Sequence, residues 1–347
     1  MYLKFYGLTE KPFDLTPNPR FLFQTPGHRE ALAQLIYGVQ EQKGFTLMTG
    51  EVGTGKTTLL RTLVQRLDGQ AECAFIMNST LSFDEIIEYA LADFGVKDPR
   101  GTRARRLMAL NQFLIAQHRA GRKTILIIDE AQNLDIATLE QIRLLSNFET
   151  SSGKLLQIIL AGQPELYAKL RLPQLRQLKQ RIGLRCMLQP LTGDEIGQYI
   201  VNHFRVAGAR DRQPFTPAAI RRVAQYSGGI PRVVNMVCDH CLLIGYANQT
   251  REIDADTVRR AVEYLEEGAA PAGWKQLLGP GRPTMARYSR RAVAWSATAV
   301  AAAVAAVAAA VAVLSLGAYR PAFTAVPTTV VAAVGGVVRW LTHWWGS

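Results

Sequence analysis

Two kinds of hydrophobic pattern follow one another along the chain. From residue 31 to residue 190, short apolar runs of strand length alternate with segments whose apolar residues recur at helical spacing. This alternation predicts an α/β domain with a parallel sheet, with strands expected at residues 44–49, 72–77, 124–128, 155–161 and 184–188. Between residues 191 and 267 only the helical spacing remains, which predicts a smaller all-α domain.

The first predicted strand runs into a glycine-rich loop, and the next helical segment follows directly. The candidate binding residues of this stretch are Gly50, Glu51, Val52, Gly53, Thr54, Gly55, Lys56, Thr57 and Thr58. This spacing between a strand and a helix is typical of a P-loop, whose backbone amides bind phosphate. We therefore expect Lys56 to contact the β- and γ-phosphates of ATP and Thr57 to bind Mg²⁺.

An acidic pair, Asp129 and Glu130, follows the predicted buried strand at residues 124–128. Strands of open α/β sheets bind ligands at this C-terminal edge. Downstream of a P-loop the pattern is typical of a Walker B element, in which Asp129 holds Mg²⁺ and Glu130 activates the attacking water. The alternative is an ordinary acidic strand end. The pair favours hydrolysis of ATP over binding alone.

Four further residues are candidates for completing the site. Gln163 follows the fourth predicted strand and is either a sensor of the γ-phosphate or a turn residue without that role. Arg181, and after it Arg176, is a candidate arginine finger directed at a neighbouring subunit, because its guanidinium stays charged. A solvated basic helix is the alternative. Arg232 follows Gly-Gly-Ile-Pro at the start of a helix, and we expect it to fold over the phosphates.

Residues 1–30 form a lead-in rich in proline and aromatic residues. We expect it to pack against the α/β domain, which spans residues 31–190; a role as a wall of the adenine pocket stays open. The whole chain carries a formal net charge of +12, which is compatible with nucleic acid, with an anionic membrane surface or with neither.

The composition changes after residue 267. Residues 268–291 are rich in Gly, Pro and Arg and are predicted to be a linker. Residues 292–316 carry no charge and are long enough to cross a bilayer, so we predict a transmembrane helix there rather than an alanine-rich soluble helix. The arginines before it place the ATPase domain in the cytoplasm. Residues 317–347 form a hydrophobic, tryptophan-rich tail, in which a second span stays open.

Several short motifs together resemble one family. Besides the P-loop they are Phe5-Tyr6-Gly7-Leu8, Pro17-Asn18-Pro19-Arg20, His28-Arg29-Glu30-Ala31-Leu32, Asp129-Glu130-Ala131-Gln132 and Gly162-Gln163-Pro164-Glu165-Leu166. Over residues 1–267 the chain is similar to the ExeA/GspA family of general secretion pathway ATPases, which includes the ATPases of exopolysaccharide and exosortase loci. The resemblance implies an AAA+ fold, namely a P-loop NTPase sheet core with a C-terminal all-α lid, here followed by the predicted transmembrane helix.

The resemblance also implies a place in the cell. It predicts an ATP hydrolase at the bacterial inner membrane that helps envelope secretion or polysaccharide export proteins to assemble or work, with ATP and Mg²⁺ as cofactors. An arginine finger acting between subunits implies a homo-oligomer, in the form of a ring. Secretion-pathway members often carry a peptidoglycan-binding domain beyond the membrane span, and none is expected here.

Two other classes of function stay open. DNA-associated AAA+ ATPases of transposition and replication initiation share this core, and the basic charge suits DNA, but no clear helix-turn-helix follows the all-α domain. A membrane-tethered nucleotide switch that barely hydrolyses ATP is the other, and Glu130 argues against it because a switch has little use for a general base.

Overall fold

The computed structural model describes residues 2–16, 18–77, 80–97, 101–151, 153–209 and 213–267. The predicted linker, transmembrane helix and tryptophan-rich tail lie outside these ranges. No helix within the described ranges is long and apolar enough to cross a membrane.

The described residues form a five-stranded parallel sheet in the order β2-β3-β6-β1-β7. Its strands are β1 Phe45–Gly50, β2 Ala71–Ile76, β3 Lys123–Ile128, β6 Gln157–Gly162 and β7 Ile182–Leu188. All five lie within two residues of the predicted bounds. A separate antiparallel hairpin of β4 Glu149–Thr150 and β5 Gly153–Lys154 was not predicted from the sequence.

Parallel pairing places the functional loops at one edge of the sheet. In the register of β1 and β6, Phe45 lies opposite Ile158 and Thr49 opposite Gly162. β3 continues the same register on the other side of β6, from Ile125 opposite Gln157. The P-loop, the Asp129-Glu130 pair and Gln163 therefore follow three neighbouring strands that end together.

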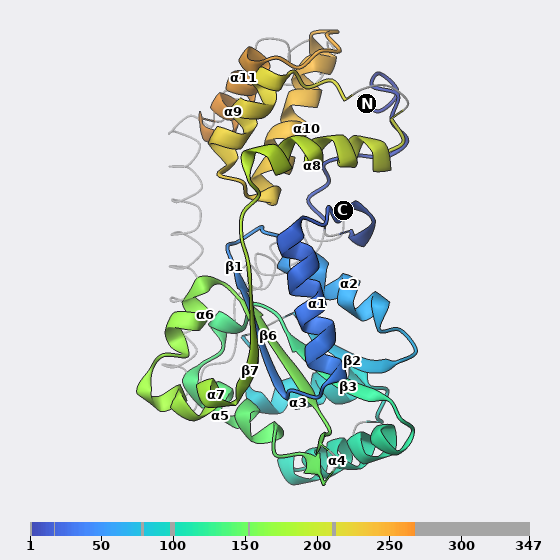
Figure 1. Cartoon of the computed structure of the whole chain (residues 1–347), viewed down its shortest axis with the longest axis vertical. Helices are drawn as coiled ribbons and strands as arrows, with labels where there is room; N and C mark the ends of the chain where they lie inside the picture. The colour runs from blue at the N-terminus through green and yellow to red at the C-terminus, as the bar shows by residue number, and fades with distance from the viewer. Residues whose placement is uncertain are drawn as a thin grey trace, which may run out of the picture. The chain divides into compact units, whose positions relative to one another are not determined.

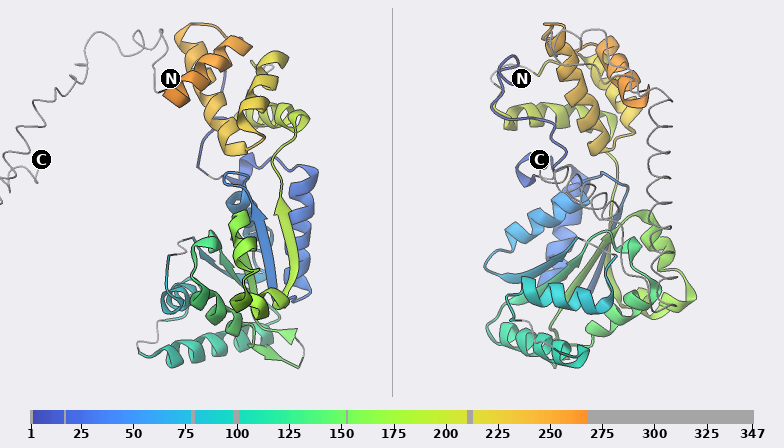
Figure 2. Two further views of the ribbon diagram at one scale, coloured as in Figure 1. Left: turned by 90° about the vertical axis from the view of Figure 1, so that its left-hand side faces the viewer. Right: turned by 180° about the vertical axis from the view of Figure 1, so that it is seen from behind.

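Helices cover both faces of the sheet, as continuous apolar strands require. Ile125 and Ile127 of β3 pack into a cluster with α1 and α2, whereas Leu126 and Ile128 pack into another with α3, α4 and α5. Figure 2 shows α1 on one side of the sheet and the green helices on the other. The helices of these layers are α1 Pro26–Gln40, α2 Lys56–Arg66, α3 Phe83–Asp93, α4 Arg103–Arg119, α5 Ile136–Leu145, α6 Pro164–Lys169 and α7 Arg176–Arg181.

Beyond β7 the described chain is helical, as its hydrophobic spacing predicts. The helices are α8 Gly193–Val206, α9 Pro217–Ser227, α10 Pro231–Ala247 and α11 Ala255–Glu267, shown beyond one end of the sheet in Figure 1. Thr192 and Glu195 form a capping box that begins α8, and the Thr216 side chain caps α9. The apolar faces of these helices share one cluster around Val234 and Leu242.

The N-terminal residues pack differently from the prediction. We call residues 2–16 and 18–25 the N-terminal strap. Its residues Tyr2, Leu8 and Phe13 are buried in the cluster of α8–α11, not against the α/β domain, and Thr9 donates from its backbone nitrogen to the carbonyl oxygen of Ala207 at 2.9 Å. The physical reason is that the aromatic side chains complete the apolar core of the small helical domain. The short helix η1, Pro19–Phe21, contacts both α2 and α8.

Candidate nucleotide-binding site

The loop between β1 and α2 depends on two glycines. Gly53 has a φ of 81° and Gly55 a φ of 96°, in the left-handed region where a side chain strains the backbone. A Cβ atom on Gly53 would also lie 2.6 Å from the Cβ atom of Arg232. The loop therefore curls as a phosphate-binding cradle does, with its amides preceding the N-terminus of α2.

The ammonium group of Lys56 lies inside this loop. The side chain is buried, and its Nζ donates hydrogen bonds to the carbonyl oxygens of Gly50 at 2.7 Å and Glu51 at 3.0 Å. Burial lowers the pKa of Lys56, while the nearby carboxylates of Glu130 and Asp129 act to raise it. Because an ammonium group has three donors, one remains for a phosphate oxygen.

Thr57, in the first turn of α2, contacts Asp129, which follows β3. The Thr57 hydroxyl donates to Oδ2 of Asp129 at 2.6 Å, and Oδ1 accepts from the backbone nitrogen of Glu130 at 2.9 Å. Asp129 is only 3% exposed, and this burial raises its pKa, while the hydrogen bond from Thr57 acts in the opposite direction. A hydroxyl and a carboxylate side by side are the oxygen ligands that Mg²⁺ prefers, so the site fits this ion.

Glu130 is held by two amide side chains. Its Oε2 accepts from Nε2 of Gln132 at 2.6 Å and from Nε2 of Gln163 at 3.4 Å. Gln132 in turn accepts from the backbone nitrogen of Gln163 at 3.1 Å. The structure thus brings the predicted residues Glu130 and Gln163 together and adds Gln132, which the sequence offered only as part of a motif.

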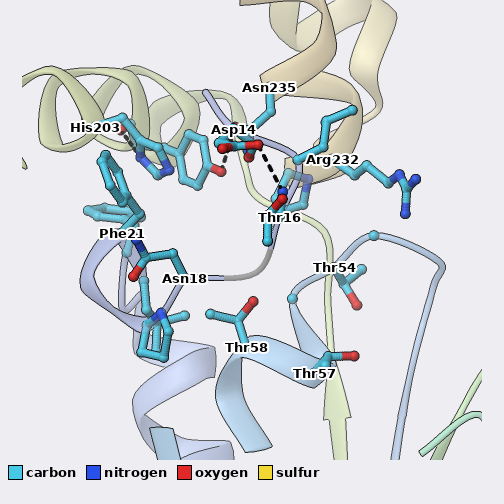
Figure 3. Close-up of a pocket in the computed structure, with 18 of the residues that line it drawn as sticks. Asp14, Thr16, Asn18, Phe21, Thr54, Thr57, Thr58, His203, Arg232 and Asn235 are labelled. Carbon is cyan, nitrogen blue, oxygen red and sulfur yellow. Dashed lines mark hydrogen bonds between the residues drawn. The ribbon is translucent and has the colours of Figure 1, made fainter. Parts of the chain in front are cut away.

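A cavity of about 550 Å³ runs from the P-loop to α8 and α10. Its lining includes Thr54, Lys56, Thr57 and Glu130 at one end. At the other end lie side chains of the N-terminal strap and the helical domain, namely Asp14, Thr16, Phe21, Phe23, Tyr199, His203 and Asn235. Figure 3 shows Thr54 and Thr57 on one side of this space and Phe21, His203 and Asn235 on the other. The strap therefore lines the same cavity as the P-loop, and its role as a wall of the adenine pocket stays a prediction.

Arg232 connects the helical domain to the P-loop through its backbone. Its amide nitrogen donates to the carbonyl oxygen of Gly53 at 3.2 Å, at the start of α10. The side chain is exposed and lines the cavity. This places Arg232 beside the predicted phosphate site.

His28 is a site residue that sequence reasoning did not assign. It is buried in the first turn of α1, with Nδ1 2.8 Å from the Thr25 hydroxyl and Nε2 3.3 Å from the carbonyl oxygen of Thr54. Burial lowers its pKa, so the neutral ring bridges α1 and the P-loop. In the sequence His28 appeared only within the motif His28-Arg29-Glu30-Ala31-Leu32, and its contact with Thr54 is tertiary.

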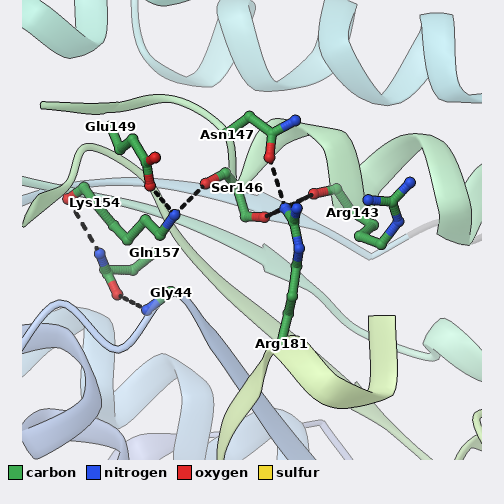
Figure 4. A network of polar contacts seen from close by, with 8 residues as sticks. All are labelled: Gly44, Arg143, Ser146, Asn147, Glu149, Lys154, Gln157 and Arg181. Carbon is green, nitrogen blue, oxygen red and sulfur yellow. Dashed lines mark hydrogen bonds and ion pairs between the residues drawn. The ribbon is translucent and has the colours of Figure 1, made fainter. Parts of the chain in front are cut away.

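The two arginine-finger candidates differ in their surroundings. Figure 4 shows Arg181 bonded to the end of α5 in its own subunit: its Nη1 contacts the carbonyl oxygen of Arg143 at 3.2 Å, the Ser146 hydroxyl, and Oδ1 of Asn147 at 2.7 Å. Arg176, at the start of α7, is exposed. The structure therefore gives Arg181 an intramolecular role that its sequence position did not indicate.

Comparison with known proteins identifies the family. An AAA domain model matches residues 39–170. The chain is 43% identical over 255 residues to general secretion pathway protein A of Aeromonas hydrophila, a match that covers 73% of this chain and 46% of that protein. The chain belongs to the general secretion pathway protein A family of AAA+ ATPases. The resemblance read from the sequence motifs is thereby confirmed.

Other matches are more distant. The chain is 25% identical over 255 residues to an uncharacterized HTH-type transcriptional regulator of Methanocaldococcus jannaschii, covering 68% of this chain and 60% of that one. It thus spans less than two thirds of the length of either curated relative.

Solved structures show the same fold. The Aeropyrum pernix ORC2 protein matches 73% of this chain and 71% of its own with 20% identity and a TM-score of 0.56. Cdc6p of Pyrobaculum aerophilum matches 77% of this chain and 73% of its own, with 16% identity and a TM-score of 0.57. At these identities the likeness shows the fold alone, which confirms the predicted α/β P-loop NTPase core with its parallel sheet.

Proposed function

We propose that this protein hydrolyses ATP and that the hydrolysis serves a cell-envelope secretion or polysaccharide export system. The observation that carries the proposal is the Thr57–Asp129 contact, which lies beside Glu130 and the buried ammonium of Lys56. Membership of the general secretion pathway protein A family supports the link to secretion.

Each group in the site has a role in this reaction. Lys56 and the loop amides bind the β- and γ-phosphates, and the Thr57 hydroxyl with the Asp129 carboxylate holds Mg²⁺. The metal ion neutralises charge on the phosphate oxygens. Glu130 accepts the proton of the attacking water, while Gln132 and Gln163 orient its carboxylate. Gln163 also reports the γ-phosphate, and Arg232 closes the helical lid, α8–α11, over the nucleotide.

We further propose that residues 292–316 anchor the protein in the inner membrane, with the ATPase domain in the cytoplasm. The support is their uncharged sequence after a cluster of arginines. Membranes from cells that express the full chain should retain it during extraction at alkaline pH and release it into detergent. Release at alkaline pH without detergent would contradict the anchor.

The deciding experiment measures ATP turnover by the full chain and by Glu130→Gln. The substitution keeps the shape of the side chain and removes the base, so it should bind ATP normally and turn it over about 100-fold more slowly, or slower still. Glu252→Gln is the matched control, because Glu252 is exposed in the helical domain and does not line the cavity. Normal turnover by Glu130→Gln would remove Glu130 from the mechanism.

The same assay with double-stranded DNA separates the envelope role from a DNA-associated one. Turnover that DNA leaves unchanged supports the secretion assignment. Strong stimulation by DNA that disappears at high salt would overturn it, because phosphate contacts are salt-dependent.

A further inference from the structure

His203 of α8 lies at the end of the cavity opposite the P-loop. Only 3% of it is exposed, and aromatic rings fix its orientation. Phe13 of the strap stacks on it with ring centroids 5.7 Å apart and an interplanar angle of 8°, and the ring of Tyr199 lies 3.9 Å away. Phe21 approaches to 5.4 Å. The imidazole therefore has little freedom to turn.

A hydrogen bond determines which ring nitrogen of His203 carries the proton. Nδ1 lies 2.9 Å from the carbonyl oxygen of Tyr199, one turn earlier in α8. A carbonyl oxygen only accepts, so Nδ1 donates and Nε2 of the neutral ring is a bare acceptor. Burial lowers the pKa of His203 to about 4, so the ring is neutral at pH 7.

The acceptor nitrogen of His203 points into the cavity. Because Nδ1 bonds to its own helix, Nε2 occupies the ring edge turned away from α8, on the side of the space above Asn18 in Figure 3. Nε2 has no hydrogen-bond partner among the described residues. Phosphates held by Lys56 at one end of the cavity leave the other end, with its aromatic walls, for the base of the nucleotide.

We propose that Nε2 of His203 accepts a hydrogen bond from the exocyclic amino group of adenine and so makes the site selective for ATP over GTP. This inference rests on the proposed binding of ATP. Adenine carries a donor at position 6, whereas guanine carries a carbonyl acceptor there. A guanine oxygen would face the lone pair of Nε2, and a buried acceptor left without a donor costs affinity.

The location of His203, rather than its tautomer, distinguishes it from a structural histidine. His240 of α10 makes the same kind of bond, with Nδ1 2.8 Å from the carbonyl oxygen of Met236, and lies against the ring of Tyr264. His240 does not line the cavity. It therefore provides a matched control for loss of a histidine from the helical domain.

The test compares ATP with purine riboside 5′-triphosphate, which has hydrogen in place of the 6-amino group. Calorimetric titration of the full chain with Mg²⁺ should show ATP binding about fivefold to tenfold more tightly, the worth of one hydrogen bond. His203→Phe keeps an aromatic ring and removes the acceptor, so the two nucleotides should bind with equal affinity. GTP, which the wild type should bind more weakly than ATP, should gain relative to ATP in this variant. His240→Phe should keep the wild-type ratio.

The outcomes distinguish failure of the proposed role of His203 from failure of the proposed ATP binding. Equal affinity of the wild type for ATP and the 6-deamino analogue, or an unchanged ratio in folded His203→Phe, would overturn the role of His203 and leave ATP binding intact. A wild type that binds neither nucleotide would overturn both. If His203→Phe does not fold, His203→Gln supplies an acceptor oxygen and should keep a preference for ATP; its loss in a folded His203→Gln would count against the proposal.

Discussion

The candidate site concentrates opposite charges out of contact with water. Lys56 and Asp129 are 5% and 3% exposed. Burial lowers the pKa of Lys56 and raises that of Asp129, so it disfavours the charged form of both groups. The charge of each group acts on the pKa of the other in the opposite direction to burial. Loss of one partner would leave the other charge buried and uncompensated, which is costly. The two buried groups therefore depend on each other for compensation of their charges.

The lowered pKa of the single residue His203 predicts that the stability of the protein depends on pH. Its pKa is lowered from 6.5 to about 4 in the folded protein. Between these values the unfolded chain binds a proton on this residue and the folded chain does not. The free energy of unfolding should therefore fall as the pH decreases from 6.5 to 4, by at most about 3 kcal/mol from this group. Urea denaturation between pH 7.5 and 4 measures the effect.

The comparison variant for this titration is His203→Phe, which keeps the aromatic packing and cannot be protonated. Its free energy of unfolding should fall less over the same pH range. Some decline should remain, because burial also lowers the pKa of His28. A decline equal to that of the wild type would contradict the assigned pKa of His203.

At the scale of the elements, a contact between the segment after β7 and the segment before α10 sets the position of Arg232. The backbone nitrogen of Leu191 donates to the carbonyl oxygen of Gly229 at 2.8 Å. Gly229 has a φ of 80°, and a Cβ atom there would lie 2.1 Å from the carbonyl oxygen of Leu191. This close approach holds the start of α10, and with it the amide of Arg232, against Gly53.

Gly229→Ala should therefore damage both stability and the site. The backbone clash should lower the free energy of unfolding by more than the roughly 1–2 kcal/mol that a left-handed conformation alone costs. Gly228→Ala is the matched control, since Gly228 has a φ of 56° and nothing within 4 Å of the added atom. Urea denaturation and ATP titration of the two variants test this, and equal effects would contradict it.

At the scale of the whole molecule, we propose that the protein works as a ring in which one subunit completes the site of the next. Arg181 is bonded to α5 within its own subunit, so exposed Arg176 is the better placed of the two candidates to act on a neighbour. An arginine acting between subunits stabilises charge on the transferred phosphate and contributes a factor of about 10³–10⁵ to turnover.

Mixed oligomers test this proposal. Arg176→Ala and Lys56→Ala chains should each be inactive, and a mixture should recover part of the wild-type turnover, because intact Lys56 sites then meet intact Arg176 side chains. Arg181→Ala serves as the comparison: it should lower the thermal midpoint, whereas Arg176→Ala should not. Absence of recovery in oligomers shown to contain both chains would contradict a role for Arg176 between subunits.

The parts of the site that lie within short segments could be predicted from the sequence. The glycines of the P-loop are required by the local backbone conformation. Asp129 follows an uninterrupted apolar run, which is typical of a buried parallel strand. The alternation of strands and helices likewise determined the sheet, because the two faces of each strand need apolar residues wherever helices cover both.

The contacts between distant segments could not be predicted in this way. The strap packs on α8–α11 although its residues precede the α/β domain, since the small helical cluster is completed by aromatic rings such as Phe13. Gln163 contacts Glu130 from the end of another strand, Arg181 holds the end of α5, and His203 faces the cavity. In each case the partner lies on another element of the chain. The periodicity of apolar residues predicts which face of an element is buried, but it does not predict which other element covers that face.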